Sequence, residues 1–184
     1  MVGVYGLRVG GLEHLPAEGG FVIAANHTSN FDPWPLGLAL YPRQLHFMAK
    51  AELFNPVFTP IFERTGVFPV RRGERDPESF RTAVRIAREG GAVAMFPEGT
   101  RRTKGIRKKW EAKPHPGAAR IALAAGVPLV PAAIVGTDRL RKLRGVRVRI
   151  GEPVPLADDG VPRRVAARQA TDDLMRQIAD LEAA

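Results

Sequence analysis

The amino-acid sequence predicts an α/β fold in which a largely parallel central sheet is flanked by helices. Three short apolar runs, Phe21–Ala25 and residues 91–96 and 127–135, have the composition of strands buried on both faces of a sheet. Helix-like segments separate these runs, and such alternation is typical of parallel sheets with right-handed crossovers. The 184 residues, of which 45% are apolar, suffice for one globular core. We therefore expect residues 1–184 to form a single domain.

The predicted helices have recognisable starts and ends. Residues 76–90 begin at Asp76, a favoured N-cap residue, and stop at Gly90. Residues 117–126 form an alanine-rich helix that leads into the third strand. Residues 51–64 carry an apolar face, but two internal prolines must kink or break a helix there. The last helix, residues 162–182, is expected to pack through Val165, Ala170, Leu174, Ile178 and Leu181.

The charge of the chain is concentrated in two segments. There are 28 Lys and Arg against 19 Asp and Glu, a formal net charge of +9. Residues 101–113 carry seven basic residues and one acid, and residues 139–149 carry six basic residues and no acid. Basic segments of this kind favour a polyanionic partner, either nucleic acid or an anionic membrane surface. The alternative is that both are solvated faces that aid solubility.

The composition also excludes several classes of protein. Without cysteine the chain can form neither disulfides nor thiolate metal sites, and it has no cysteine nucleophile. No run approaches the roughly 18 apolar residues of a membrane-spanning helix, and a signal peptide is not recognisable. We therefore expect a cytoplasmic protein, either soluble or peripheral to a membrane.

A polar cluster with reactive side chains follows the first buried strand. Ligands of α/β sheets bind where strands end, which is the place of His27 and Asp32 in the motif NHTSNFD. Asp32 precedes Pro33 and is expected to cap the next helix. If its carboxylate accepts a hydrogen bond from His27, the other imidazole nitrogen is free to take a proton from a hydroxyl group. The alternative is a turn histidine beside a simple helix cap.

The chain lacks the motifs of several catalytic mechanisms, and their absence limits the reactions that His27 could support. Its serines are Ser29 and Ser79, and neither lies in a Gly-x-Ser-x-Gly motif. The four histidines are scattered, without the paired spacing of zinc sites, and neither GxGxxG nor a P-loop occurs. A base without a metal or a protein nucleophile favours direct attack by a hydroxyl group of the substrate.

Cationic and acidic residues follow the other predicted strands. Lys50 and Arg72 each close a short strand, and the loop from Glu98 to Arg102 follows the strand at residues 91–96. Guanidinium groups and a hydroxyl beside a glycine turn suit a phosphate. The strand ends are expected to converge on one rim, which would place a proton acceptor beside an anion site. Each charge taken alone is also typical of an ordinary surface residue.

Four blocks of this sequence together resemble the glycerolipid acyltransferases. The blocks are NHTSNFD, GVFPVRR, FPEGTRR and VPLVP, in this order, and the resemblance extends over most of the chain. It departs from the commoner second block at Pro69, where phenylalanine is usual. The resemblance implies transfer of a fatty acyl group from a thioester to the sn-2 hydroxyl of 1-acylglycerol 3-phosphate, making phosphatidate in phospholipid biosynthesis.

The resemblance also implies roles for individual residues. His27 would be the general base and Asp32, spaced as in an H-x4-D motif, would orient it. Pro128 and Pro131 would shape the fourth block near the acyl donor. The glycerol-phosphate site would comprise Arg72, Glu98, Gly99, Thr100 and Arg101, with Lys50 as a further cation.

The partners implied by the resemblance are lysophosphatidate and an acyl thioester. The donor would be acyl-CoA or an acyl carrier protein, whose acidity the basic segments complement, and neither a metal nor another cofactor is required. An anionic membrane surface at the inner face of the cell membrane is expected to contact Trp34, Trp110, the basic segments and the apolar face of residues 53–62.

Two alternatives stay open: a different acceptor, such as glycerol 3-phosphate or another lysolipid, and a basic module that binds nucleic acid or membranes. The first is distinguished by relative rates on an acceptor panel. The second lacks a helix-turn-helix, zinc or RNA-binding signature.

Overall fold

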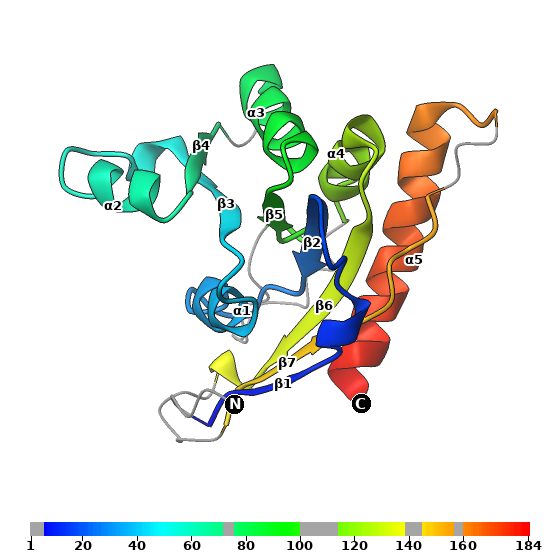
Figure 1. Ribbon diagram of the computed structural model, residues 1–184, viewed down its shortest axis with the longest axis horizontal. Helices are drawn as coiled ribbons and strands as arrows, with labels where there is room; N and C mark the ends of the chain where they lie inside the picture. The colour runs from blue at the N-terminus through cyan, green and yellow to red at the C-terminus, as the bar shows by residue number, and fades with distance from the viewer. Residues whose placement is uncertain (1–5, 72–75, 100–113, 139–144, 157–159) are drawn as a thin grey trace, which may run out of the picture.

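The strands of the protein form one sheet whose order differs from their order in the sequence (Figure 1). A computed structural model describes residues 6–71, 76–99, 114–138, 145–156 and 160–184. Within this part of the chain the sheet has seven strands in the order β1-β7-β6-β2-β5-β3-β4. Their bounds are Arg8–Gly10 (β1), Phe21–Ala25 (β2), Leu45–Lys50 (β3), Phe68–Val70 (β4), Ala92–Met95 (β5), Leu129–Val135 (β6) and Arg147–Ile150 (β7).

The sheet is largely parallel, as the sequence predicts. Strands β6, β2, β5, β3 and β4 run in one direction, whereas β7 is antiparallel to β6 and β1 is parallel to β7. β2 lies in the middle, with Ala24 opposite Met95 of β5 on one side and Pro131 of β6 on the other. The carboxyl ends of the five parallel strands therefore meet at one edge of the sheet.

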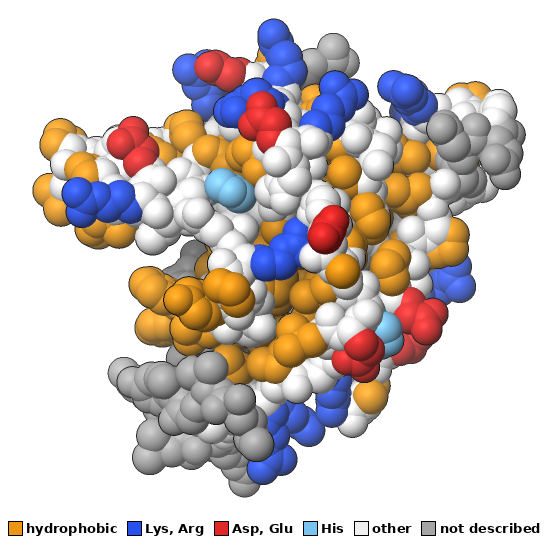
Figure 2. All heavy atoms as spheres, viewed as in Figure 1, with side chains coloured by type: hydrophobic (Ala, Val, Ile, Leu, Met, Phe, Trp, Pro, Cys, Tyr) orange, Lys and Arg blue, Asp and Glu red, His pale blue; other side chains and the backbone are white. Residues whose placement is uncertain are grey.

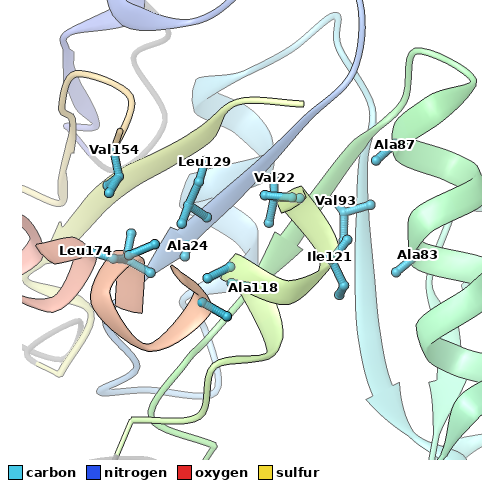
Figure 3. Close-up of a cluster of buried hydrophobic side chains, with 14 of the residues drawn as sticks. Val22, Ala24, Ala83, Ala87, Val93, Ala118, Ile121, Leu129, Val154 and Leu174 are labelled. Carbon is cyan, nitrogen blue, oxygen red and sulfur yellow. The ribbon is translucent and has the colours of Figure 1, made fainter. Parts of the chain in front are cut away.

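Two hydrophobic cores cover the two faces of the sheet. Side chains of a strand alternate between faces, so Val22 and Ala24 enter one core while Phe21, Ile23 and Ala25 enter the other. The first core, part of which is drawn in Figure 3, includes apolar residues of α3 (Pro77–Arg88), α4 (Gly117–Ala125) and α5 (Arg163–Ala183). The second includes α1 (Pro33–Ala39). Burial on both sides explains why β2 is apolar at every position.

The predicted helix boundaries are confirmed for two helices. Asp76 caps α3 by accepting a hydrogen bond from the backbone N–H of Ser79, and Gly90 has the positive φ that ends such a segment. α4 ends at Gly126, again with positive φ. The segment 51–64 is broken as predicted, into a short 3-10 helix, η2 (Ala51–Leu53), and α2 (Thr59–Arg64). A further short 3-10 helix, η1 (Leu12–His14), follows β1.

The prediction that Val165 belongs to the packing face of α5 is wrong. Ala170, Leu174 and Ile178 are buried, but Val165 is 45% exposed. Five residues rotate an α-helix by about 500°, which turns Val165 roughly 140° away from Ala170.

Among the described residues, no helix combines the length and the hydropathy that crossing a membrane requires.

Candidate active site

Buried polar side chains gather where the central strands end. Six polar or charged residues are buried among those described. Asn26 and Asp32 follow β2, Glu98 follows β5 and Thr137 follows β6. The other two, Ser79 and Thr171, donate to backbone carbonyls within their own helical segments. Because burying a polar group is costly unless it has partners, this gathering marks the carboxyl edge of the sheet as a candidate functional site.

His27 and Asp32 form a hydrogen-bonded pair at this edge. The distance from Nδ1 of His27 to Oδ2 of Asp32 is 2.8 Å. The Asp32 side chain is completely buried, whereas 13% of the His27 side chain is exposed. A carboxylate oxygen can only accept a hydrogen bond, so Nδ1 of His27 carries the proton and donates it. Nε2 is therefore left as the nitrogen that can accept a proton.

The carboxylate of Asp32 does not cap α1, which corrects the expectation from the sequence. Asp32 occupies the N-cap position, but its side chain makes no capping hydrogen bond. Oδ2 instead accepts from the backbone N–H groups of Thr28 at 2.7 Å and Ser29 at 2.8 Å. The carboxylate is thus held by the loop before it, facing His27. The physical reason is that this loop offers two N–H donors and an imidazole, which together satisfy a buried charge better than one helix terminus.

An aromatic ring fixes the imidazole from a second direction. The ring of Phe96, at the end of β5, stacks on that of His27 with centroids 4.2 Å apart and an interplanar angle of 19°. Phe47 of β3 in turn lies 6.3 Å from Phe96. The neighbouring strands β2, β5 and β3 thus place His27, Phe96 and Phe47 in one stack of rings.

Asn26 connects the loop that carries His27 to the rest of the fold. Its side-chain amide donates to the carbonyl of Ile134 at 2.9 Å and accepts from the N–H of Ile134 at 2.7 Å. The same amide donates to Oε1 of Glu182 in α5 at 2.7 Å. A buried amide that satisfies both its donor and its acceptor in this way fixes the end of β2 against β6 and against the last turn of α5.

The residues expected at the anion site are described in part. Glu98 is buried and Gly99 has a φ of 67°, in the left-handed region, where its N–H donates to the carbonyl of Phe96. Lys50 is exposed at the end of β3, on the same edge of the sheet. Arg72, Thr100 and Arg101 lie outside the described residues.

Of the two basic segments, the structure describes only residues 145–149 of the second. Residues 101–113 lie outside the described residues. Within the second segment, Arg149 of β7 donates to the carbonyl of Leu181 at 2.8 Å, close to the carboxyl end of α5. Alternate residues of β7, including Val148, are buried. This described part of the segment therefore follows strand alternation, and Arg149 has an intramolecular role.

Three contacts of the site were not predicted from the sequence: those of Asn26, the hydrogen bond from the Thr137 hydroxyl to Oδ1 of Asp32, and the stacking of Phe96 on His27. Asn26 belongs to the motif NHTSNFD and Phe96 to the motif FPEGTRR, but a motif does not indicate which strands are neighbours in the sheet. For Thr137 the available signal was its place two residues after a buried strand, the same signal that singled out His27.

The sequence and the fold match a known class of protein. Residues 6–135 match the family described as Acyltransferase, and the chain belongs to that family. It is 36% identical over 182 residues to the 1-acyl-sn-glycerol-3-phosphate acyltransferase of Bacillus subtilis (strain 168), covering 96% of this chain and 88% of the relative.

Two further relatives extend the comparison. A 1-acyl-sn-glycerol-3-phosphate acyltransferase of Streptococcus pneumoniae is 28% identical over 143 residues, 75% of this chain and 51% of the relative. The crystal structure of the 1-acyl-sn-glycerophosphate (LPA) acyltransferase PlsC from Thermotoga maritima superposes with a TM-score of 0.65 at 25% identity, covering 97% of this chain and 73% of that protein.

Proposed function

We propose that this protein transfers a fatty acyl group from an acyl thioester to the sn-2 hydroxyl of 1-acylglycerol 3-phosphate, making phosphatidate for phospholipid biosynthesis. Two relatives that match most of its length are named as acyltransferases of 1-acyl-sn-glycerol 3-phosphate or 1-acyl-sn-glycerophosphate, which supports this acceptor. The observation that carries the proposal is the His27–Asp32 pair, in which a buried carboxylate holds Nδ1 and leaves Nε2 to accept a proton.

In the proposed mechanism His27 acts as a general base. Nε2 takes the proton of the sn-2 hydroxyl while the oxygen attacks the thioester carbonyl, forming a tetrahedral intermediate. Collapse of that intermediate breaks the carbon–sulfur bond, and the imidazolium returns the proton to the departing thiolate. Asp32 stabilises the imidazolium between these two steps, because its negative charge lies 2.8 Å from Nδ1.

The proposed acceptor site lies beside this pair. Lys50, Arg72 and Arg101 would bind the phosphate of lysophosphatidate, since ammonium and guanidinium groups suit that anion. Glu98, Gly99 and Thr100 would hold the glycerol part against the turn that follows β5. The burial of Glu98 and the left-handed backbone of Gly99 support a shaped site at that turn.

The donor is proposed to be acyl-CoA or an acyl carrier protein. Both present a fatty acyl group as a thioester on a phosphopantetheine arm, so the same attack serves either. Direct comparison of thiol release from the two donors decides between them.

We further propose that the protein works at the surface of an anionic membrane. Eight of the ten large apolar side chains exposed in the described part of the chain lie in two stretches. One is Phe31, Trp34, Leu38 and Tyr41, on and beside α1, and the other is Leu53, Val57, Phe58 and Ile61, around α2. Figure 2 shows apolar side chains gathered over these two helices. Aromatic and aliphatic groups of this kind suit the interfacial layer of a bilayer.

The stretch at α1 begins in the catalytic loop itself. Phe31 is exposed, whereas its neighbour Asp32 is buried in the site, so the same few residues face both the solvent and His27. A bilayer that contacts α1 would thus lie close to the site at which a lipid acceptor has to enter. We name these eight side chains the apolar face.

The function is tested by thiol release from each donor in the presence of lysophosphatidate, with phosphatidate identified as the product. We expect His27→Ala to lower kcat by at least about 1,000-fold, as loss of an essential base does. His46→Asn is the matched control, because His46 is a half-buried histidine of β3 whose imidazole contacts the carbonyl of Gly66. Wild-type rates in His27→Ala would contradict the proposal, and faster acylation of another acceptor would correct the acceptor.

A further inference from the structure

We infer that Thr137 is a positioning residue for the catalytic pair, and that it acts by fixing the second oxygen of Asp32. This inference rests on the proposed function for the role of His27. The carrying observation is a hydrogen bond of 2.5 Å between Oγ1 of Thr137 and Oδ1 of Asp32, in a place where Thr137 is 3% exposed.

The direction of this hydrogen bond follows from its neighbours. Oγ1 of Thr137 also lies 3.2 Å from Oγ1 of Thr28. A carboxylate oxygen can only accept, so the one hydroxyl proton of Thr137 points to Asp32. Thr28 must then donate to Thr137. The result is a chain of hydrogen bonds from Thr28 through Thr137 to Oδ1, and such chains strengthen their members in a buried site.

The two oxygens of Asp32 have different tasks. Oδ2 accepts from the N–H groups of Thr28 and Ser29 and from His27, so all three bonds meet at one atom. Bonds to a single oxygen leave the carboxylate plane free to swing about it. The bond from Thr137 holds the other oxygen and thereby sets the plane, which determines the direction from which Nδ1 of His27 approaches.

Thr137 is itself held by the central sheet. It follows β6, the strand that pairs with β2 and that Asn26 clamps through both backbone groups of Ile134. Gly136 precedes it with a φ of 100°, and a Cβ there would lie 3.0 Å from the carbonyl oxygen of Gly145. The turn that aims Thr137 at Asp32 therefore requires glycine. The contact spans 105 residues of sequence and connects two neighbouring strand ends.

The test compares three variants of the whole protein. Thr137→Val keeps the shape but removes the hydroxyl, Thr137→Ser restores a hydroxyl, and Thr171→Val is the matched control. Thr171 is also a buried threonine, but its hydroxyl bonds to the carbonyl of Ala167 within α5. Removing that hydroxyl affects the fold without touching the site, so thermal melting of all three variants is measured alongside the kinetics.

We expect Thr137→Val to lower kcat by about 10- to 100-fold, the usual effect of losing a group that orients a reactive residue. KM for lysophosphatidate and for the donor should change by less than about threefold, since Thr137 is not expected to touch substrate. Thr137→Ser should recover most of kcat, and Thr171→Val should keep it even if its melting temperature falls.

A second measurement does not depend on activity. Nitrogen-15 NMR of the His27 ring should show the Nδ1–H tautomer in the wild type and in Thr171→Val, because the hydrogen bond of one ring nitrogen sets the tautomer. Thr137→Val should give mixed tautomers or a rapidly exchanging Nδ1 proton.

The outcomes separate this inference from the proposed function. An unchanged kcat together with an unchanged ring spectrum in Thr137→Val overturns the positioning role, as does an equal loss of kcat in Thr171→Val. If the wild type acylates no lysolipid with either donor, the proposed function fails. The ring spectra then still decide whether Thr137 positions the pair.

Discussion

At the scale of single residues, the environment of Asp32 is unusually well defined. Four hydrogen bonds reach its carboxylate, three at Oδ2 and one at Oδ1. A buried carboxylate loses its hydration, and bonds to N–H and O–H groups offset that cost. The same bonds keep Asp32 an acceptor facing His27. Stability and the proposed chemistry therefore depend on one set of contacts.

Asp32→Asn separates the charge of this residue from its geometry. The amide oxygen can take the place of Oδ2 and accept the same three bonds, while the NH₂ group faces Thr137, whose hydroxyl can rotate to accept. We therefore expect a folded protein in which the imidazolium has lost its counter-charge. The expected loss in kcat is about 10- to 1,000-fold, because the lost charge stabilises the transition state by about 1.4–4 kcal/mol.

The measurement is kcat for thiol release, together with thermal melting. Asp172→Asn serves as the control, because Asp172 is an exposed acid of α5 in a long pair with Arg168. A kcat for Asp32→Asn within about threefold of the wild type would show that the charge of Asp32 does not assist His27.

At the scale of elements, the start of α3 is sensitive to pH. Hydrogen bonds from the backbone N–H of Arg71, and then from that of Ser79, lower the pKa of Asp76 from its ordinary value of 3.8. A lowered pKa in the folded state means that the ionised group stabilises the fold at neutral pH. That contribution is lost as the pH falls below 3.8 through the lowered pKa.

We expect Asp76→Ala to reduce the free energy of unfolding by about 1 kcal/mol at pH 7, as removal of an N-cap does. The difference from the wild type should shrink as the pH falls below 3.8. Melting temperatures measured across that range check this. Glu78→Gln removes a negative charge from the same turn without removing the cap, and should show a smaller loss. A difference that grows in acid would refute the assignment.

The elements themselves could largely be predicted from the sequence, because their signals are local. The apolar run of β2 matches Phe21–Ala25 at both ends. The segment at residues 51–64 is broken as expected, with Pro56 in the break and Pro60 in the first turn of α2. The pairing of strands could not be predicted, because β2 lies between two strands that occur later in the chain. Contacts that depend on this strand order, such as that of Thr137 with Asp32, could therefore not be predicted from the sequence.

The orientation of Asp32 could not be predicted for a related reason. Its position before Pro33 indicates a helix cap, and the spacing from His27 indicates a hydrogen-bonded pair. The two expectations compete for one carboxylate. The outcome depends on the conformation of residues 28 and 29, whose N–H groups converge on Oδ2, and on the burial that removes water as a partner.

At the scale of the whole molecule, the apolar face predicts binding to lipid vesicles. Trp34 is 71% exposed and Phe58 is 50% exposed, one in each of the two stretches. Burying such a side chain contributes about 1.5–3 kcal/mol. We therefore expect the double variant Trp34→Ser with Phe58→Ser to bind phosphatidylglycerol vesicles at least about tenfold more weakly.

Sedimentation with vesicles measures this binding, with phosphatidylcholine vesicles to show the part due to charge. Val165→Ser is the matched control, since Val165 is an exposed apolar residue of α5 outside both stretches. Equal weakening by the control would count against the apolar face, as would unchanged binding of the double variant.

The central position of β2 in the sheet also has a consequence for folding during synthesis on the ribosome. Its nearest partner along the chain, β5, begins 67 residues after β2 ends, and β6 comes later still. At about 5–20 residues per second, a ribosome needs roughly 3 to 13 seconds to make that stretch. During this time the five apolar residues of β2 have no sheet to enter. The strand that precedes His27 is thus expected to expose apolar side chains during synthesis, and exposed apolar surface is the feature that makes chaperones necessary for nascent chains.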